Sequence, residues 1–363
     1  MRLLRSSFFS IDWALAFSAL LLALLGLATM YSYLGENSFF ERQAVWIVFA
    51  CVGMLAASVP DYRFLRAGSA ALFIYTVCVA MLVVVLFFGD VALGAQSRFN
   101  FGFFSLQPAD PAKLALIIVL AKYFAKRHVE IAHLRHIFVS GLYAGALCAL
   151  LFFQPDFGSA LIVGGIWLGM LLVSGISLRH LALFGLLCTL SFGLLWSVGL
   201  REYQKERIVT FLDPFADTAG AGYNAYQSTI AVGSGQFFGT GVGFGTQSKL
   251  QFLPEYETDF IFAAFAEEWG TVGVAVLFAL FGVVIWRVLS VALHSAGNYE
   301  RFFCAGVAIF FISHFFVHVG MNIGLLPVTG TTIPFLSYGG SHLVVEFVAL
   351  GMVMGIRKAR AVS

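Results

Sequence analysis

The chain has 363 residues, of which 60% are hydrophobic and only 11% are charged, and its mean hydropathy is +0.91. A soluble domain of this length could not cover so apolar an interior with polar surface, so the composition excludes a soluble globular protein and predicts a polytopic membrane protein. The net charge of +2 comes from dispersed Lys and Arg residues, so we expect no nucleic-acid partner.

Ten apolar segments are each long enough to cross a bilayer with some tilt. The fourth is the least apolar, because it is short and carries Lys113 and Lys122. No small-residue cleavage site follows the basic start of the chain, so we expect a retained first helix. The sequence thus predicts an all-α polytopic membrane protein with one transmembrane domain over residues 1–363. The segments lie near residues 12–33, 43–59, 68–89, 111–126, 137–153, 157–174, 180–199, 260–288, 302–323 and 340–356.

The distribution of charge predicts the orientation of these segments. If both termini are cytoplasmic, 14 of the 21 Lys and Arg residues fall on the inner side, as the positive-inside rule requires. Seven of the eight prolines then fall on the outer side, so we expect the outer loops to have defined shapes and to carry function. The longest outer loop covers about residues 200–259, between the seventh and eighth segments.

Three motif-like features are interpreted as structural. Residues 233–245 (GSGQFFGTGVGFG) follow no predicted strand, so they indicate turns and close backbone approach rather than a nucleotide-binding loop. His128, His133 and His136 lie in a basic loop without an acidic or Cys partner, which favours a solvated connector over a metal site. The five cysteines lie in apolar runs and are interpreted as small hydrophobic side chains.

Acidic residues concentrate in residues 250–270, LQFLPEYETDFIFAAFAEEWG, at and inside the eighth segment. Charge inside a membrane is costly, so such acids indicate function unless they are paired. Asp259 stands where the predicted helix begins, and an N-cap role explains it about as well as a functional one. Glu267 lies deeper and Glu268 faces nearly opposite, so neither can form a close catalytic pair with Asp259. We expect structural or cavity-lining roles for both glutamates.

Two polar pairs stand four residues apart on the last two segments, at the spacing where helical side chains meet. They are His318 with Asn322 and His342 with Glu346. Polar contact between helices is the simpler interpretation, and a substrate groove is the alternative.

The acidic stretch carries a family resemblance. LPEYETDFIFA (253–263) resembles the LPExxTDFIFA signature of the RodA/FtsW (SEDS) family, the membrane proteins of bacterial wall synthesis. The stretch GTQSKLQFLPE (245–255) resembles the elongation branch, RodA, more than the division branch. Further segments resemble motifs of this family in the family's order, so that the resemblance covers essentially the whole chain. They are residues 94–115, 154–160, 203–214, 222–235 and 325–341.

The chain departs from the family pattern at two motifs. The family's QPSE reads QPAD here, so Asp110 keeps the charge of a glutamate but has a shorter reach toward a partner such as Lys113. Ser97-Arg98-Phe99 replaces the usual Arg-Trp pair. Neither departure involves Asp259.

The resemblance implies a peptidoglycan glycosyltransferase of the bacterial cytoplasmic membrane. Members of the family polymerise lipid II, an undecaprenyl-pyrophosphate-linked disaccharide pentapeptide, into glycan strands. They work with a class B penicillin-binding protein, a transpeptidase. The resemblance places the essential carboxylate at Asp259, which could accept the proton of the acceptor 4-OH as general base in an inverting displacement.

The outer cations Arg98, Lys113 and Arg207 are our candidates to face the leaving pyrophosphate, and a divalent cation such as Mg²⁺ or Mn²⁺ could share that role. The structural alternatives are that Arg98 and Lys113 reach lipid headgroups and that Arg207 pairs with Glu202 or Glu206.

The matching motifs also imply substrate-binding roles for four further residues. Gln154 and Asp156 belong to the QPDFGSA segment, where they could instead only shape the turn at Pro155. Gln247 and Ser337 belong to the segments 245–255 and 325–341.

Two other functions remain open on the sequence alone. A lipid II flippase or other transporter would use buried acids such as Glu267 as a translocation or proton path. A non-enzymatic scaffold for wall-synthesis enzymes would need no acid at Asp259. We find no convincing internal repeat of the kind common in transporters.

Overall fold

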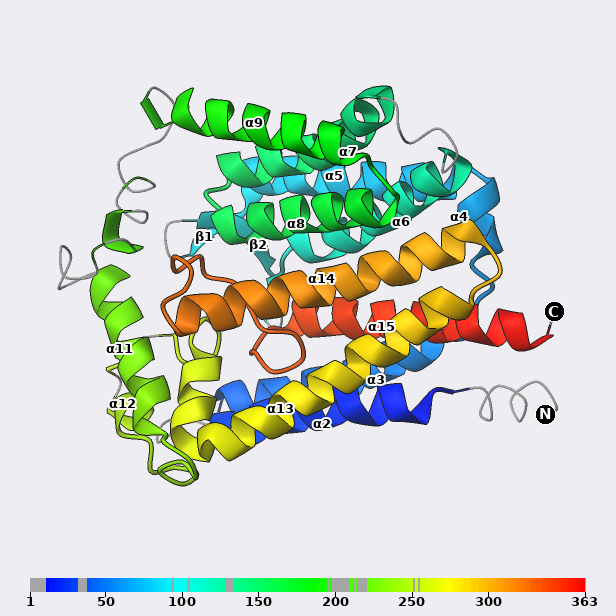
Figure 1. Cartoon of the computed structure of the whole chain (residues 1–363). Helices are drawn as coiled ribbons and strands as arrows, with labels where there is room; N and C mark the ends of the chain where they lie inside the picture. Colours follow the sequence, from blue (N-terminus) through cyan, green and yellow to red (C-terminus); the bar gives the residue numbers. More distant parts are fainter. Residues whose placement is uncertain are drawn as a thin grey trace.

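The structure is a computed structural model that describes residues 11–31, 38–92, 95–102, 105–127, 134–194, 196–197, 205, 209–211, 213, 221–250, 252–253 and 255–362. It is a bundle of long helices, and a short sheet lies at one end together with α11 and α12 (Figure 1). The helices are α2 (Trp13–Tyr31), α3 (Ser38–Ala57), α4 (Arg63–Ala67), α5 (Ala70–Phe88), α6 (Ala109–Arg127), α7 (Leu134–Phe153), α8 (Phe157–Val173), α9 (Leu178–Leu194), α11 (Ala221–Ser234), α12 (Thr246–Lys249), α13 (Ile261–His294), α14 (Asn298–Asn322) and α15 (Gly340–Val362).

The predicted helical membrane fold is confirmed, and each of the ten apolar segments overlaps one long helix. Among the described residues, seven helices are long and apolar enough to cross a membrane: α2, α3, α5, α7, α13, α14 and α15. The helix α8 is apolar but has 17 residues, and α6 carries Lys113 and Lys122. How many of the ten cross a bilayer therefore stays a prediction.

A small antiparallel sheet between α5 and α6 was not predicted. Its strands are β1 (Asp90–Ala92), β2 (Ala95–Asn100) and β3 (Ser105–Leu106), in the order β1-β2-β3. Asp90 faces Arg98 across the first pair, and the peptide N–H of Asn100 donates to Asp90 Oδ2 at 3.1 Å. Strands this short give little periodicity to detect in a sequence. The sheet holds Arg98 in an extended backbone at one end of the bundle.

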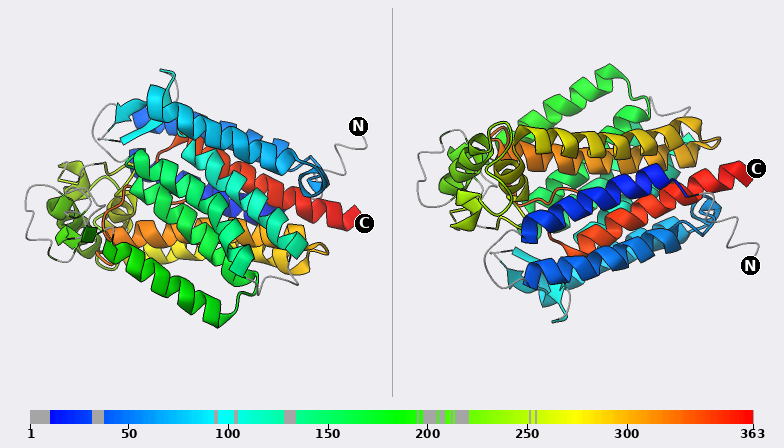
Figure 2. Two further views of the ribbon diagram at one scale, coloured as in Figure 1. Left: turned by 90° about the horizontal axis from the view of Figure 1, so that it is seen from above. Right: turned by 90° about the horizontal axis from the view of Figure 1, so that it is seen from below.

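The core forms where helices far apart in sequence pack together. Helix α15 packs on α3, α13 packs on α2 and α14, and α14 packs on α6 and α8. Figure 2 shows α2, α3 and α15 lying side by side on one face of the bundle. At the end where the chain finishes, the buried carboxylate of Asp12 pairs with Arg287 and Arg357, and so ties α2 to α13 and α15.

Helix α13 is broken at Gly270, where φ is 64° and ψ is −169°. The glycine-rich segment fills the break. The N–H groups of Thr240 and Gly241 donate to the carbonyls of Glu267 and Glu268, and Gln236 and Phe237 accept from Thr271 and Val272. Backbone groups that a helix break would otherwise leave unsatisfied are therefore paired. The predicted close backbone approach of residues 233–245 is what the structure contains.

Candidate active site

One cavity of about 770 Å³ lies at the end of the bundle that carries the sheet. Strand β2, the first turns of α6 and α8, the 255–260 turn and the segment from Thr329 to His342 all contribute to its wall. The lining is strongly polar for a protein of this composition. Its acidic and basic members are Arg98, Asp110, Lys113, Asp156, Glu255, Glu257, Asp259, His314 and His342.

Asp259 lies in the turn that precedes α13 and lines the cavity. The peptide N–H of Asp259 donates to the Glu255 carbonyl at 3.0 Å, and the carbonyl of Asp259 accepts from Asn322 Nδ2 at 3.0 Å. A Cβ on Gly330 would lie 3.3 Å from Asp259 Oδ2, so the carboxylate sits against a residue that leaves room for it. The N-cap of α13 is Phe260, one residue further on, so Asp259 is not placed as the capping residue.

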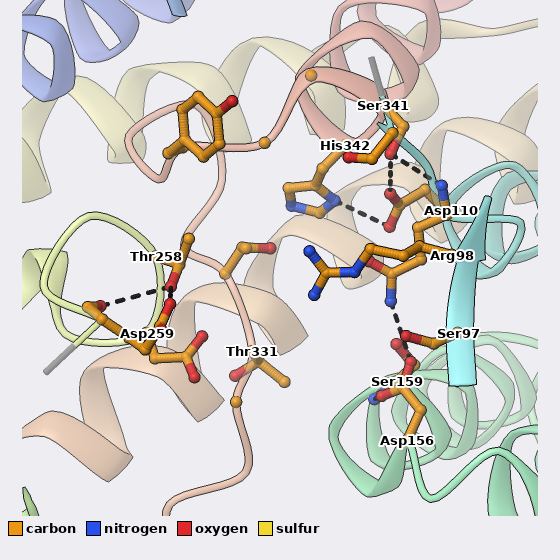
Figure 3. Close-up of a pocket in the computed structure, with 18 of the residues that line it drawn as sticks. Ser97, Arg98, Asp110, Asp156, Ser159, Thr258, Asp259, Thr331, Ser341 and His342 are labelled. Atoms are coloured by element: carbon orange, nitrogen blue, oxygen red, sulfur yellow. Dashed lines mark hydrogen bonds and ion pairs between the residues drawn. The ribbon is translucent and has the colours of Figure 1, made fainter. Parts of the chain in front are cut away.

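Arg98 reaches into the cavity from the wall opposite Asp259. Figure 3 shows its guanidinium directed into the cavity, away from strand β2 and toward the side where Thr258 and Asp259 lie. Among the described residues its buried Nε has no hydrogen-bond partner. An unpaired buried donor on a cationic group favours an anionic ligand.

Lys113 is almost completely buried and belongs to a chain of charged groups. Lys113 Nζ lies 3.3 Å from Asp110 Oδ1, and His342 Nδ1 lies 3.2 Å from the same oxygen. His342 Nε2 lies 2.9 Å from Glu346 Oε1, while Glu346 Oε2 accepts from the peptide N–H of Phe335 at 2.9 Å. The aspartate therefore does reach Lys113, because both residues lie one turn apart on α6.

The sequence did not identify Asp110 and His342 as site residues, although it contained signals for both. The QPAD motif drew attention to Asp110, and the i,i+4 spacing of His342 and Glu346 predicted their contact. Figure 3 shows that His342 and Ser341 approach Asp110 from α15. Ser341 Oγ donates to Asp110 Oδ2 at 2.9 Å. The pairing of His342 with Asp110 could not be predicted, because the residues are 232 positions apart.

Asp156 lines the cavity and also stabilises it. Its Oδ1 accepts from the peptide N–H of Ser159 at 3.0 Å and so caps α8, while its Oδ2 accepts from Gln107 Nε2 at 3.0 Å. Gln154 lies outside the cavity. It is fully buried, and its Nε2 donates to the Leu82 carbonyl at 2.9 Å, which ties the α7–α8 turn to α5.

Ser337 and Gln247 do not line the cavity either, and each is bonded to another segment of the chain. Ser337 Oγ donates to the Thr258 carbonyl at 3.0 Å and so fixes the turn that carries Asp259. The peptide N–H of Gln247 donates to Glu267 Oε1 at 2.9 Å. Arg207 lies outside the described residues.

Glu267 and Glu268 have structural roles, as expected. Glu267 Oε2 accepts from Ser248 Oγ at 2.9 Å, and Glu268 Oε1 accepts from the peptide N–H of Gly243 at 2.9 Å. Both carboxylates thereby hold the segment that fills the break in α13.

Glu257 adds a third carboxylate beside Glu255 and Asp259. Burial raises the pKa of Glu257, and the nearby Glu255 carboxylate raises it further. The wall around Asp259 is therefore acidic. No group of three or more His, Cys, Asp or Glu side chains in the described part of the chain could hold a metal ion by itself.

The chain matches the family model FtsW/RodA/SpoVE, described as cell cycle protein, over residues 6–361. It is 39% identical to the probable peptidoglycan glycosyltransferase FtsW of Thioalkalivibrio sp. (strain K90mix), covering 96% of this chain and 89% of that protein. It is 38% identical to the peptidoglycan glycosyltransferase MrdB of Escherichia coli (strain K12), covering 79% and 78%.

The fold of the chain is also similar to solved structures. The chain superposes with a TM-score of 0.83 and 29% identity on a chain from a peptidoglycan synthase complex that coordinates polymerization and crosslinking, covering 96% and 98% of the two chains. It superposes on the rod shape determining protein RodA of Thermus thermophilus with a TM-score of 0.72 and 28% identity, covering 96% and 97%.

Proposed function

The chain belongs to the FtsW/RodA/SpoVE family of peptidoglycan glycosyltransferases, and from this premise we propose that it polymerises lipid II with Asp259 as general base. The observation that carries the proposal is the arrangement of one cavity, in which Asp259 faces Arg98 across a polar space of about 770 Å³. A sugar hydroxyl needs a base on one side, and a departing pyrophosphate needs a cation on the other.

The proposed step is one displacement at the anomeric carbon of the donor sugar. The 4-OH oxygen of the acceptor forms a bond to C1, its proton passes to the Asp259 carboxylate, and the pyrophosphate leaves with the electron pair of the broken C1–O bond. A single displacement inverts the configuration at C1. Arg98 binds the leaving pyrophosphate, since its guanidinium suits phosphate oxygens.

Lys113 supports the same charge from deeper in the cavity. Its ammonium lies 3.3 Å from Asp110, so it contributes a positive charge at a fixed position. We assign Arg207 to the pyrophosphate on the family resemblance alone. Gln154 and Ser337 act at a distance, since each holds backbone that borders the site. We assign Gln247 to substrate binding on the family resemblance alone.

A divalent cation is a further proposal, and the protein residues alone do not suit it. No ready cluster of metal ligands exists among the described side chains. Magnesium in phosphoryl sites is often held by one or two carboxylates together with substrate phosphates. We therefore expect any ion to arrive with the pyrophosphate.

The family membership also supports a proposal for the membrane, the orientation and the partner of the chain. We propose the bacterial cytoplasmic membrane, with both termini cytoplasmic and the cavity on the outer face, where the donor's lipid tail can lie between helices. The bias of Lys and Arg supports this orientation. A class B penicillin-binding protein is the proposed partner, and the stretch 245–255 favours a role in elongation over division.

The test is glycan synthesis from labelled lipid II by the purified chain with its transpeptidase partner, compared with Asp259→Asn. A ladder of glycan strands from the wild type and none from the variant is the expected result. Ladders from both would remove Asp259 from the reaction. If neither forms strands with partner and Mg²⁺ present, a translocation assay in vesicles would decide whether the chain transports lipid II instead.

A further inference from the structure

His314 is a residue of the cavity wall that the proposed reaction does not use. It lies on α14, is 1% exposed and lines the cavity. Its Nδ1 lies 3.1 Å from the Thr332 carbonyl. A carbonyl can only accept, so Nδ1 carries the proton and the neutral ring leaves Nε2 as a bare acceptor. Within the described residues, this buried Nε2 has no hydrogen-bond partner.

The neighbouring histidine keeps His314 neutral. The two rings lie 4.8 Å apart. His342 lies between two carboxylates, with Asp110 Oδ1 3.2 Å from Nδ1 and Glu346 Oε1 2.9 Å from Nε2, and two neighbouring carboxylates favour a positively charged ring. A positive ring at this distance opposes a second positive ring. Lys113, whose ammonium lies on the other side of Asp110, opposes it too.

An unsatisfied buried acceptor needs a donor, which water supplies in the empty cavity and a ligand supplies when it is bound. An anionic phosphate oxygen cannot serve, because it would meet the Nε2 lone pair. A sugar offers hydroxyl groups, and an acetamido sugar adds an amide N–H. We infer that His314 accepts a hydrogen bond from a hydroxyl or amide N–H of a sugar unit, while the pyrophosphate lies at Arg98. The inference rests on the proposed function, and divides the cavity into a sugar part and a phosphate part.

The test measures binding, which does not depend on catalysis. Two ligands are titrated onto the purified full chain in detergent: lipid II, and undecaprenyl pyrophosphate, which has the same lipid and pyrophosphate but no sugar. His314→Phe removes the acceptor and keeps a ring of similar size beside Phe310, which His314 already contacts. We expect the Kd for lipid II to rise about 3- to 10-fold, the effect of one neutral hydrogen bond, and the Kd for undecaprenyl pyrophosphate to stay unchanged.

His318 provides a matched control one turn further along α14. It is equally buried, and its Nδ1 contacts the Thr331 carbonyl at 2.6 Å. In the described part of the chain its Nε2 also has no partner, but His318 does not line the cavity. His318→Phe should leave both affinities at the wild-type level. His314→Gln, which keeps an acceptor, should restore lipid II binding at least in part.

Three outcomes would overturn the inference. They are an unchanged lipid II affinity in His314→Phe, an equal loss for both ligands, or the same loss in His318→Phe. Arg98→Gln separates the inference from the proposed function, because it should weaken both ligands. If wild type binds lipid II but forms no glycan strands, the proposed reaction fails and the assignment of His314 can still be judged.

Discussion

At the scale of single residues, the cavity combines side chains that no local pattern would group. Asp259 and Arg98 come from a turn and from a strand that are more than 150 residues apart in the chain, and they face one cavity (Figure 3). Asp110 joins Lys113 and His342 by hydrogen bonds of 3.3 and 3.2 Å to a single oxygen. Buried charges of this kind are stable only when each has its counter-charge.

Asp110→Asn tests this balance. The substitution leaves two buried cations beside a neutral side chain, so we expect a loss of about 3–5 kcal/mol in the free energy of unfolding. Activity should fall as well, since Lys113 loses its anchor. Thermal unfolding in detergent measures the first effect, and the glycan ladder measures the second.

Ser341→Ala is the control for Asp110→Asn. It removes one neutral donor to the same aspartate and leaves both cations paired, so a loss of about 1 kcal/mol is expected. If the two variants unfold at the same temperature, the contacts of Asp110 with Lys113 and His342 do not stabilise the fold.

At the scale of elements, the glycine-rich segment and the break in α13 form one unit. Gly239 has φ of +81°, and a Cβ there would lie 2.0 Å from the Glu268 carbonyl oxygen. Gly270 at the break would place a Cβ 2.2 Å from the Gly239 nitrogen. Glycine is required at both positions, because backbone meets backbone there.

Gly239→Ala should therefore destabilise the protein by about 2–4 kcal/mol, since it combines a strained φ with a backbone clash. The loss should appear in thermal unfolding of the purified chain. It should be accompanied by faster proteolysis of the segment 235–250, which would no longer fill the break.

Gly233→Ala is the matched change in the same region. Gly233 lies in the last turn of α11, and among the described residues no atom outside the local helix backbone lies within 4 Å of an added Cβ. Alanine is the better helix former, so this variant should be more stable than wild type by about 0.5–1 kcal/mol. Equal destabilisation by both changes would contradict the assigned role of Gly239.

At the scale of the whole molecule, the bundle has two different ends. The cavity, the sheet and α11–α12 lie at one end, and α15 finishes at the other (Figure 1). At this second end the carboxylate of Asp12 receives two guanidinium groups, from α13 and α15. Helices α2 and α15 are thereby joined far from the candidate active site.

Asp12→Asn should cost about 2 kcal/mol, because a 2% exposed carboxylate loses two partners that are themselves partly solvated. Glycan synthesis at low temperature should remain, since the cavity is at the opposite end. Asp61→Asn breaks an exposed pair with Arg63, and its unfolding should stay within about 0.5 kcal/mol of wild type. A complete loss of activity in stable Asp12→Asn would show that the two ends are coupled.

The proposed orientation predicts which end meets the outside. In a chain without its native cysteines, Phe244→Cys near α12 should react with an impermeant maleimide in intact spheroplasts. Arg63→Cys at the other end should react only after the membrane is opened. Both side chains are exposed, at 70% for Phe244 and 63% for Arg63, so access to reagent is decided by sidedness alone. The reverse pattern would invert the topology.

Local sequence patterns were sufficient to predict the class of fold, the position of the long helices and the prominence of Asp259. Apolar length and charge bias act locally along the chain, and a bilayer imposes the same length on every spanning helix. The sequence also contained the pairing of His342 with Glu346, because neighbours on one helix face follow from helical geometry.

The tertiary structure alone decided which polar residues share the cavity. It brought His342 to Asp110 and placed His314 in the cavity wall, and it placed Gln154 and Ser337 outside the cavity, where each bonds to a backbone carbonyl of another segment. These contacts join distant elements, and their geometry depends on how helices cross and where turns lie. No local periodicity encodes such contacts, so they become visible only when the packed helices are in place.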